Sequence, residues 1–216
     1  MVTKENAQRD HQPLDYLAEN RTGSVRLARF YSNLVSPPTI FAAMGLGVAF
    51  HSMPFWSALF WGGLFGIMLA LLPVVIIVLM IRAGKIGELH MSNTRERRIP
   101  YLISIGLAFV VLGLDYAFQL PVAMKSVTMF VIMDLVLLFI ITLFWLISMH
   151  TTAAAAAAGL IVIIWGWFWG FVIGIPLVLS VIWNRLYLKR HTPAQAWFGV
   201  ALGLGSAAVF SMFRTF

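Results

Sequence analysis

The chain has 216 residues, of which 61% are hydrophobic and 11% are charged, and its formal net charge is +7. A soluble domain of this size cannot bury so much apolar surface, because small domains leave a large share of their surface exposed. The chain contains no cysteine, which excludes disulfides, thiolate metal sites and cysteine catalysis. The basic residues lie in short loops between apolar segments. This placement favours membrane lipids or an anionic lipid phosphate as partners, and not nucleic acid.

The N-terminal part is polar, and residues 1–24 lack the apolar core of a cleavable signal peptide. The stretch 25–35 places two arginines beside three large apolar residues, a pattern typical of an amphipathic helix at the membrane surface. We therefore expect residues 1–35 to form a polar tail and an interfacial segment. Residues 36–216 are expected to form one transmembrane helical domain.

The remaining segments have the length of membrane crossings, which need about 20 apolar residues each. A strongly basic loop is predicted over 83–99, and helices are predicted over 37–53, 54–82, 100–120, 126–149 and 193–212. The block 151–184 is long, with glycine and proline in its middle and tryptophans typical of a membrane interface. It predicts two helices that meet near Trp169, the second, over about 172–186, being the shorter. The expected fold is all-α, a polytopic membrane bundle of six to seven transmembrane helices.

Counting the crossings places three polar clusters on one side of the membrane. Two crossings separate the loop 83–99 from His150, and two more separate His150 from the loop 185–192. Most basic residues lie on that same side. The positive-inside rule then predicts a multi-pass protein of the cell membrane whose polar, active-site face is cytoplasmic.

The loop 185–192 carries the first features of a phosphate site. Thr192 suits a helix N-cap and Pro193 suits the first helical turn. His191 would then lie at a helix N-terminus, where unpaired N–H groups and the helix dipole favour an anion. Arg185 precedes it by six residues, and a guanidinium can bind a phosphoryl group with two parallel hydrogen bonds.

The other two polar clusters add a second histidine and further arginines. His150 stands beside Ser148 at a predicted helix start, before the alanine run 153–158, which permits close helix packing and predicts a central helix. The third cluster, in the basic loop, comprises His90, Asn93, Arg95, Arg97 and Arg98. Two histidines and several arginines on one side indicate phosphoryl transfer: one imidazole attacks phosphorus, arginines neutralise the oxygens, and the second imidazole protonates the leaving oxygen.

These residues resemble the type 2 phosphatidic acid phosphatases, whose fold is shared with the vanadium haloperoxidases. The family pattern comprises Lys-x6-Arg-Pro, Pro-Ser-Gly-His and Ser-Arg-x5-His-x3-Asp. The third part is matched by Asn184-Arg185-x5-His191-x3-Gln195 and the second by Ile147-Ser148-Met149-His150. The first part is degraded: Arg97 matches its arginine, Pro100 follows closely, and His90 stands at the lysine position. The resemblance covers about residues 85–205, the expected phosphatase-like core.

The resemblance implies roles for these residues. His191 would be the nucleophile that forms a phosphohistidine, and His150 the general acid. The implied phosphate-binding residues are Arg185 and Arg97, with Ser148 in support. In the basic loop, His90, Arg95 or Arg98 could replace the cation of the missing lysine, and Asn93 is a further candidate for phosphate binding. Gln195 replaces the aspartate that orients the nucleophile; it can accept a hydrogen bond from His191 but cannot supply the negative charge that stabilises an imidazolium. The family needs no metal or cofactor for hydrolysis, so we expect none.

The expected function is an integral-membrane phosphatase acting on a lipid phosphate or an isoprenoid (di)phosphate, with the substrate's tail in the lipid between helices. A phospho-head-group transferase on the same scaffold and a non-catalytic lipid-phosphate binder are the alternatives. Asp115 and Asp134, with Lys125 between them, predict a structural Asp–Lys cluster, or the ion pathway of a small transporter. Lys189 and Arg190 are expected to extend to lipid head groups.

Overall fold

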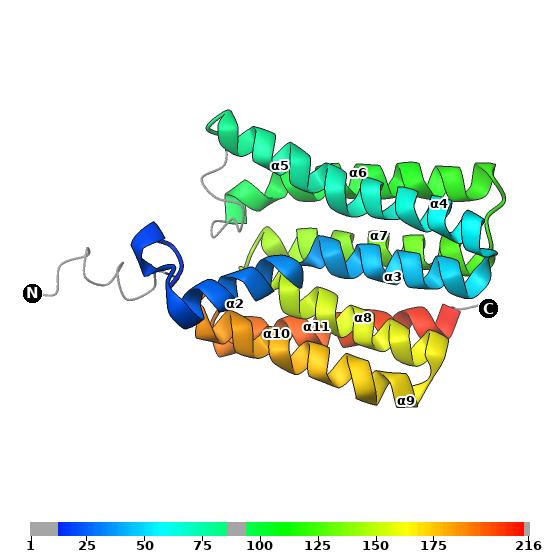
Figure 1. Cartoon of the computed structure of the whole chain (residues 1–216). Coiled ribbons are helices and arrows are strands. Elements are labelled where there is room, and N and C mark those ends of the chain that lie inside the picture. The colour runs from blue at the N-terminus through cyan, green and yellow to red at the C-terminus, as the bar shows by residue number, and fades with distance from the viewer. Residues whose placement is uncertain (1–12, 86–93, 214–216) are drawn as a thin grey trace, which may run out of the picture.

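The computed structural model describes residues 13–85 and 94–213, and this part of the chain is helical apart from short connections, with no β-strand (Figure 1). The all-α prediction is therefore confirmed. The α-helices are α2 (Gly23–Leu34), α3 (Pro37–Ser52), α4 (Phe55–Gly66), α5 (Leu72–Arg82), α6 (Thr94–Ala117), α7 (Val122–Thr142), α8 (Met149–Trp165), α9 (Trp167–Trp169), α10 (Ile175–Tyr187) and α11 (Pro193–Phe213). A short 3₁₀ helix, η1 (Ala18–Asn20), precedes them, and the π-helical turns η2 (Ile67–Leu71) and η3 (Gly170–Gly174) join α4 to α5 and α9 to α10.

The described residues include five continuous helices that are long and apolar enough to cross a membrane: Phe55–Arg82, Glu96–Ala117, Val122–Thr142, Trp167–Tyr187 and Pro193–Met212. The pair α2 and α3, bent by 44°, would be a sixth if it counts as one span. Helix α8 has 17 residues, or about 26 Å, which is slightly less than the hydrocarbon core of a bilayer. These apolar helices indicate a multi-pass membrane protein with five or six candidate spans among the described residues, and α8 is a shorter apolar helix.

Helix α8 lies in the interior of the bundle, as its alanines predict. In Figure 1, α4, α5 and α6 lie on one side and α10 and α11 on the other, with α3 and α7 in the middle and α8 between α3 and α10. Residues 153–158 are each at most 8% exposed. The approach of α11 is so close that a Cβ added at Gly203 would lie 2.3 Å from the carbonyl oxygen of Thr152. Small residues on both helices therefore permit this contact.

Two predicted helix boundaries, both next to the predicted polar clusters, are wrong. The helix predicted over 126–149 ends at Thr142, and residues 143–148 connect it to α8. The loop predicted over 83–99 is shorter, because α6 already begins at Thr94 and includes Pro100. Arg97 and Arg98 therefore lie on a helix, where their direction is set by the helical geometry.

The block 151–184 does form two helices that meet at the tryptophan cluster, as predicted. Gly166 interrupts the helix there with a φ of 90°, a conformation that favours glycine. Trp167 and Trp169 beside it are exposed. The predicted lengths are wrong, however, because the return helix Trp167–Tyr187 has 21 residues and α8 has 17.

The N-terminal segment packs against the end of α10 and the loop that follows it, a contact that the prediction of a polar tail and an interfacial segment did not include. Leu14 N–H donates to the carbonyl of Leu188 at 3.0 Å. Ala28 and Ser32 of α2 are buried, and α2 contacts α10. The other side of α2 is apolar and exposed, with Leu27 70% exposed. Helix α2 is thus part of the protein core on one side only.

Candidate functional site

The starts of α6, α8 and α11 and the end of α10 lie at the same end of the bundle (Figure 1). The Nη1 of Arg97 donates to the carbonyl of Ile147 at 3.0 Å. Ser148 N–H donates to the carbonyl of Gln195 at 3.3 Å. These contacts bring the described residues of the three polar clusters, which are distant in sequence, to one end of the bundle.

Arg185 is the centre of this cluster. It is 1% exposed, and its Nη1 lies 3.5 Å from His150 Nδ1. Its Nη2 donates to Ser32 Oγ and, at 2.9 Å, to Asn184 Oδ1. The Nε of Arg185 has no hydrogen-bond partner among the described residues. A buried guanidinium with an unused donor is suited to bind an anion, because each unpaired buried donor is unfavourable.

Ser32 and Asn184 accept hydrogen bonds from Arg185, contacts that the sequence did not show. The side-chain Nδ2 of Asn184 donates to the carbonyl of Ala28 at 2.7 Å, which fixes its oxygen towards Arg185. Ser32 comes from α2, more than 150 residues before Arg185 in the chain. A single serine in an amphipathic stretch does not by itself indicate a contact with an arginine. Only the packing of α2 on α10 brings Ser32 to Arg185.

His191 is held by a reciprocal cap at the start of α11. Gln195 N–H donates to Thr192 Oγ1 at 3.3 Å, and Thr192 N–H donates to Gln195 Oε1 at 3.1 Å. This is the capping-box arrangement, which the spacing Thr-x-x-Gln makes visible in the sequence. The same Oε1 lies 3.2 Å from His191 Nδ1. The predicted cap and the predicted Gln195–His191 contact are both confirmed.

The electrostatic surroundings keep His191 neutral. Burial lowers the pKa of His191 from 6.5 to about 3, and the nearby charges of Arg97 and Arg185 act in the same direction. The acceptor Oε1 beside Nδ1 favours the tautomer with hydrogen on Nδ1. The lone pair is then on Nε2, which is the atom that could act as a nucleophile.

The remaining predicted phosphate-binding residues differ in their placement. Arg97 is 2% exposed and lies in the cluster, whereas Arg98 is exposed on α6. Ser148 is fully buried, and its Oγ accepts from Thr151 N–H at 3.4 Å as the N-cap of α8. The predictions for His90 and Asn93 lie outside the described residues. No group of three or more acidic or histidine side chains that could hold a metal ion occurs in the described part of the chain.

Arg190 does not extend to the lipid, and that prediction is wrong. Its Nε and Nη2 donate to the two carboxylate oxygens of Asp15, each at 3.0 Å. Asp15 is fully buried and also accepts from Arg29 Nη1 at 2.9 Å. The polar tail therefore supplies a carboxylate that holds the residue next to His191. Lys189, in contrast, is exposed.

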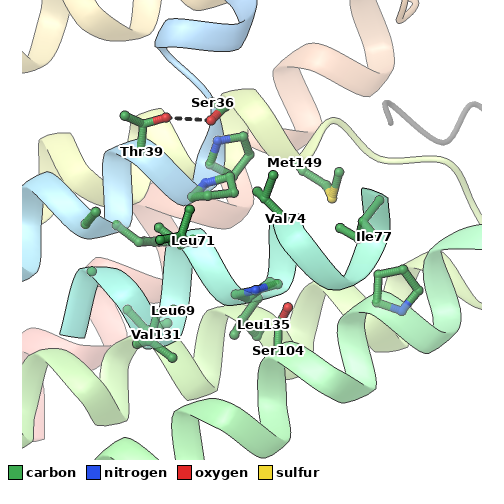
Figure 2. A pocket seen from close by; sticks show the side chains of 18 of the residues that line it. Ser36, Thr39, Leu69, Leu71, Val74, Ile77, Ser104, Val131, Leu135 and Met149 are labelled. Carbon is green, nitrogen blue, oxygen red and sulfur yellow. Dashed lines mark hydrogen bonds between the residues drawn. The ribbon is translucent and has the colours of Figure 1, made fainter. Parts of the chain in front are cut away.

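A cavity of about 710 Å³ adjoins the site. It is bounded mainly by apolar residues of α3, η2, α5, α6 and α7, and Figure 2 shows Leu69, Val74 and Leu135 among those that line it. Arg97 and His150 belong both to its wall and to the polar cluster. The arrangement therefore joins an apolar space to a group of cations and imidazoles.

The predicted Asp–Lys cluster forms only in part, because the charge of Lys125 acts on Asp115 and not on Asp134. Asp115 accepts a hydrogen bond from Thr128 at 2.6 Å, and Asp134 accepts one from Ser206 at 2.8 Å. The Nζ of Lys125 lies 4.9 Å from the ring centroid of Tyr116. The two acids thus have separate hydroxyl partners, as buried polar groups require.

Comparisons with protein-family models, with curated protein sequences and with solved structures found no match to this chain.

Proposed function

We propose that this protein is an integral-membrane phosphatase that hydrolyses a lipid phosphate or isoprenoid (di)phosphate through a phosphohistidine. One observation supports this proposal above the others. Arg97 and His150 line an apolar cavity. The buried Arg185 lies beside His150 and close to His191. Buried cations next to imidazoles suit a phosphate group, and apolar walls suit a hydrocarbon tail.

The arginines would bind the phosphate. A phosphate monoester carries a charge of about −1.5 to −2 at neutral pH, which two guanidinium groups can offset. Arg185 is held in place by Ser32 and Asn184, so little side-chain freedom remains to be lost when the anion binds. Because both arginines are already buried, their charges act strongly on the phosphoryl oxygens.

The imidazoles would carry out the bond changes. The Nε2 lone pair of His191 attacks phosphorus, the bond between phosphorus and the ester oxygen breaks, and His150 gives a proton to the leaving oxygen. Water then attacks the phosphohistidine and gives its proton to His150. The P–N bond breaks with its electron pair returning to His191, and phosphate leaves. Gln195 accepts a hydrogen bond from Nδ1–H throughout, which keeps the ring oriented.

The environment favours a lipid over a water-soluble ester. The polar cluster lies at the ends of apolar helices, where the head group of a membrane lipid resides. The basic residues of this end also agree with the positive-inside rule, so we propose that the site faces the cytoplasm.

The test is phosphate release by the purified protein in detergent, with short-chain phosphatidic acid, alkyl phosphates and prenyl diphosphates, in the presence of a chelator. We expect turnover in the wild type and a loss of about 10³-fold or more in His191→Ala. His150→Ala should lose about 10²- to 10⁴-fold. His51→Ala is the matched control, because His51 lies at the end of α3, next to Trp165 and away from the site.

An acceptor alcohol in the assay separates hydrolysis from transfer, since a transferase would yield a new phosphate ester in place of phosphate. The proposal fails if the wild type turns over none of the substrates, or if His191→Ala retains wild-type turnover with an intact fold.

A non-catalytic lipid-phosphate binder is the second candidate, and the cap of α11 favours it. The Oε1 of Gln195 already accepts from Thr192 N–H, and it brings no negative charge to His191. This candidate predicts that the wild type binds an alkyl phosphate without releasing phosphate.

A further inference from the structure

We propose that the cavity beside the site binds the hydrocarbon tail of a lipid phosphate with a single chain, so that the tail lies inside the protein. This inference rests on the proposed function for the position of the phosphate. It differs from the expectation that the tail stays in the lipid between helices, and it selects single-chain alkyl, acyl or isoprenoid phosphates over diacyl phosphatidic acid.

The cavity extends from polar residues at one end along apolar helices, as a lipid phosphate with a single tail would require. Arg97, His150 and Ser32 line its polar end. Along α5, η2 and α4 its lining runs from Ile77 back to Gly63, 14 residues, which is roughly 21 Å of helix. A substrate with its phosphate at the arginine would therefore extend its tail towards Gly63.

The volume decides between one chain and two. An apolar cavity of about 150 Å³ holds one six-carbon ring, which is roughly 25 Å³ per carbon. At that density a cavity of about 710 Å³ has room for roughly 28 carbons. One chain of sixteen to twenty carbons fits, whereas the two sixteen-carbon chains of a dipalmitoyl lipid do not.

The wall has features that keep this space open. The π-helical turn η2 interrupts the α-helix at the cavity, and such turns are frequently found at functional sites. Gly63 presents no side chain to the cavity, and a Cβ added there would meet no atom within 4 Å. The space is partly open to the surface of the apolar helices, and its apolar lining suits an apolar occupant that enters from there.

The first experiment compares substrates in mixed detergent micelles: butyl, octyl and hexadecyl phosphate, geranylgeranyl phosphate and dipalmitoyl phosphatidic acid. We expect kcat/KM to rise with chain length. It should be about 100-fold or more higher for hexadecyl phosphate than for the diacyl lipid, whose two sixteen-carbon chains exceed roughly 28 carbons by about four methylenes. The two long single-chain substrates distinguish an alkyl from an isoprenoid preference. Equal or better turnover of the diacyl lipid would overturn the proposal.

The second experiment shortens the cavity at its deep end. Gly63→Phe should lower kcat/KM for hexadecyl phosphate about tenfold, by excluding about two methylenes, and leave butyl phosphate unchanged. Gly113→Phe is the matched control, because Gly113 is exposed on α6, has open space around it and does not line the cavity. The same effect of Gly63→Phe on both chain lengths, or no effect on either, would overturn the tail site.

A binding measurement separates this inference from the proposed function. Hexadecyl phosphonate, which cannot be hydrolysed, is titrated against wild type, Gly63→Phe and Gly113→Phe. If no variant releases phosphate from any substrate, the proposed function fails. Tight binding that Gly63→Phe alone weakens would still support the tail site, and binding that does not depend on Gly63 or on chain length would overturn it.

Discussion

Replacing Gln195 with glutamate adds the negative charge that the site lacks while keeping the reach of the side chain. Its carboxylate would take the place of Oε1, which now lies 3.2 Å from His191 Nδ1 and 3.1 Å from Thr192 N. Glutamate is a regular partner in a capping box and is favoured near a helix N-terminus, so the start of α11 should be retained. Aspartate would be one methylene shorter and would weaken the cap.

The magnitude follows from the distance. Two unit charges 3.2 Å apart attract by about 5 kcal/mol at an effective dielectric constant of 20. Burying the carboxylate opposes this by several kcal/mol. We expect a net rise of about one to two units in the pKa of His191, or roughly 1.4 to 2.8 kcal/mol. Because attack through Nε2 makes the ring cationic, kcat should rise by about 10- to 100-fold.

The assay is kcat for hexadecyl phosphate, together with the histidine ring pKa from NMR of ring-labelled protein in detergent. Gln195→Ala is the control, since it removes both the cap and the contact with the ring and should lower kcat. If Gln195→Glu folds as stably as the wild type but changes neither the pKa nor kcat, then Gln195 does not limit the chemistry, and the proposed nucleophile is wrong.

Three further substitutions and one pH titration test the surroundings of the nucleophile. Asp15→Asn should destabilise the fold by about 3–5 kcal/mol, because Arg190 stays buried without its carboxylate, and the double variant Asp15→Asn with Arg190→Gln should recover part of that loss in thermal unfolding. Arg185→Gln should raise the NMR-measured pKa of His191 by removing a nearby cation; a lower value would refute the assignment. Thr192→Ala should cost about 1 kcal/mol of unfolding free energy through loss of the cap. As the pH falls from 6.5 towards 3, the unfolded chain binds the His191 proton before the folded chain, so stability should decrease by up to about 1.4 kcal/mol per pH unit, a slope absent in His191→Gln.

The position of Arg190 shows where sequence reasoning failed. A basic residue near a membrane surface is usually solvated or bound to head groups, and the isolated loop offers no other partner. Asp15 becomes that partner only because Leu14 binds Leu188, 174 residues later, which brings the tail onto the loop. Contacts of such long sequence separation leave no periodic pattern in either segment.

The cap at Thr192 shows the opposite case. Thr192, Pro193 and Gln195 are consecutive or one helical turn apart, so their hydrogen bonds depend on local geometry that the residue types already specify. The hydrogen bond between Gln195 and His191 could be derived in the same way, because the two residues are about one helical turn apart. The helix boundary at Thr142 could not, because residues 143–148 are as apolar as the helix that precedes them.

The sequence by itself determined the membrane-bundle class, the shared face of the polar clusters and the cap beside His191. These features could be predicted because they depend only on hydrophobicity, on the number of membrane crossings between clusters and on residues close together in the sequence. Tertiary structure alone decided that Arg185 is held by Ser32, that Asp15 binds Arg190 and that an apolar cavity meets Arg97 and His150. These features depend on how helices far apart in the chain pack, and on the space that their side chains leave unfilled.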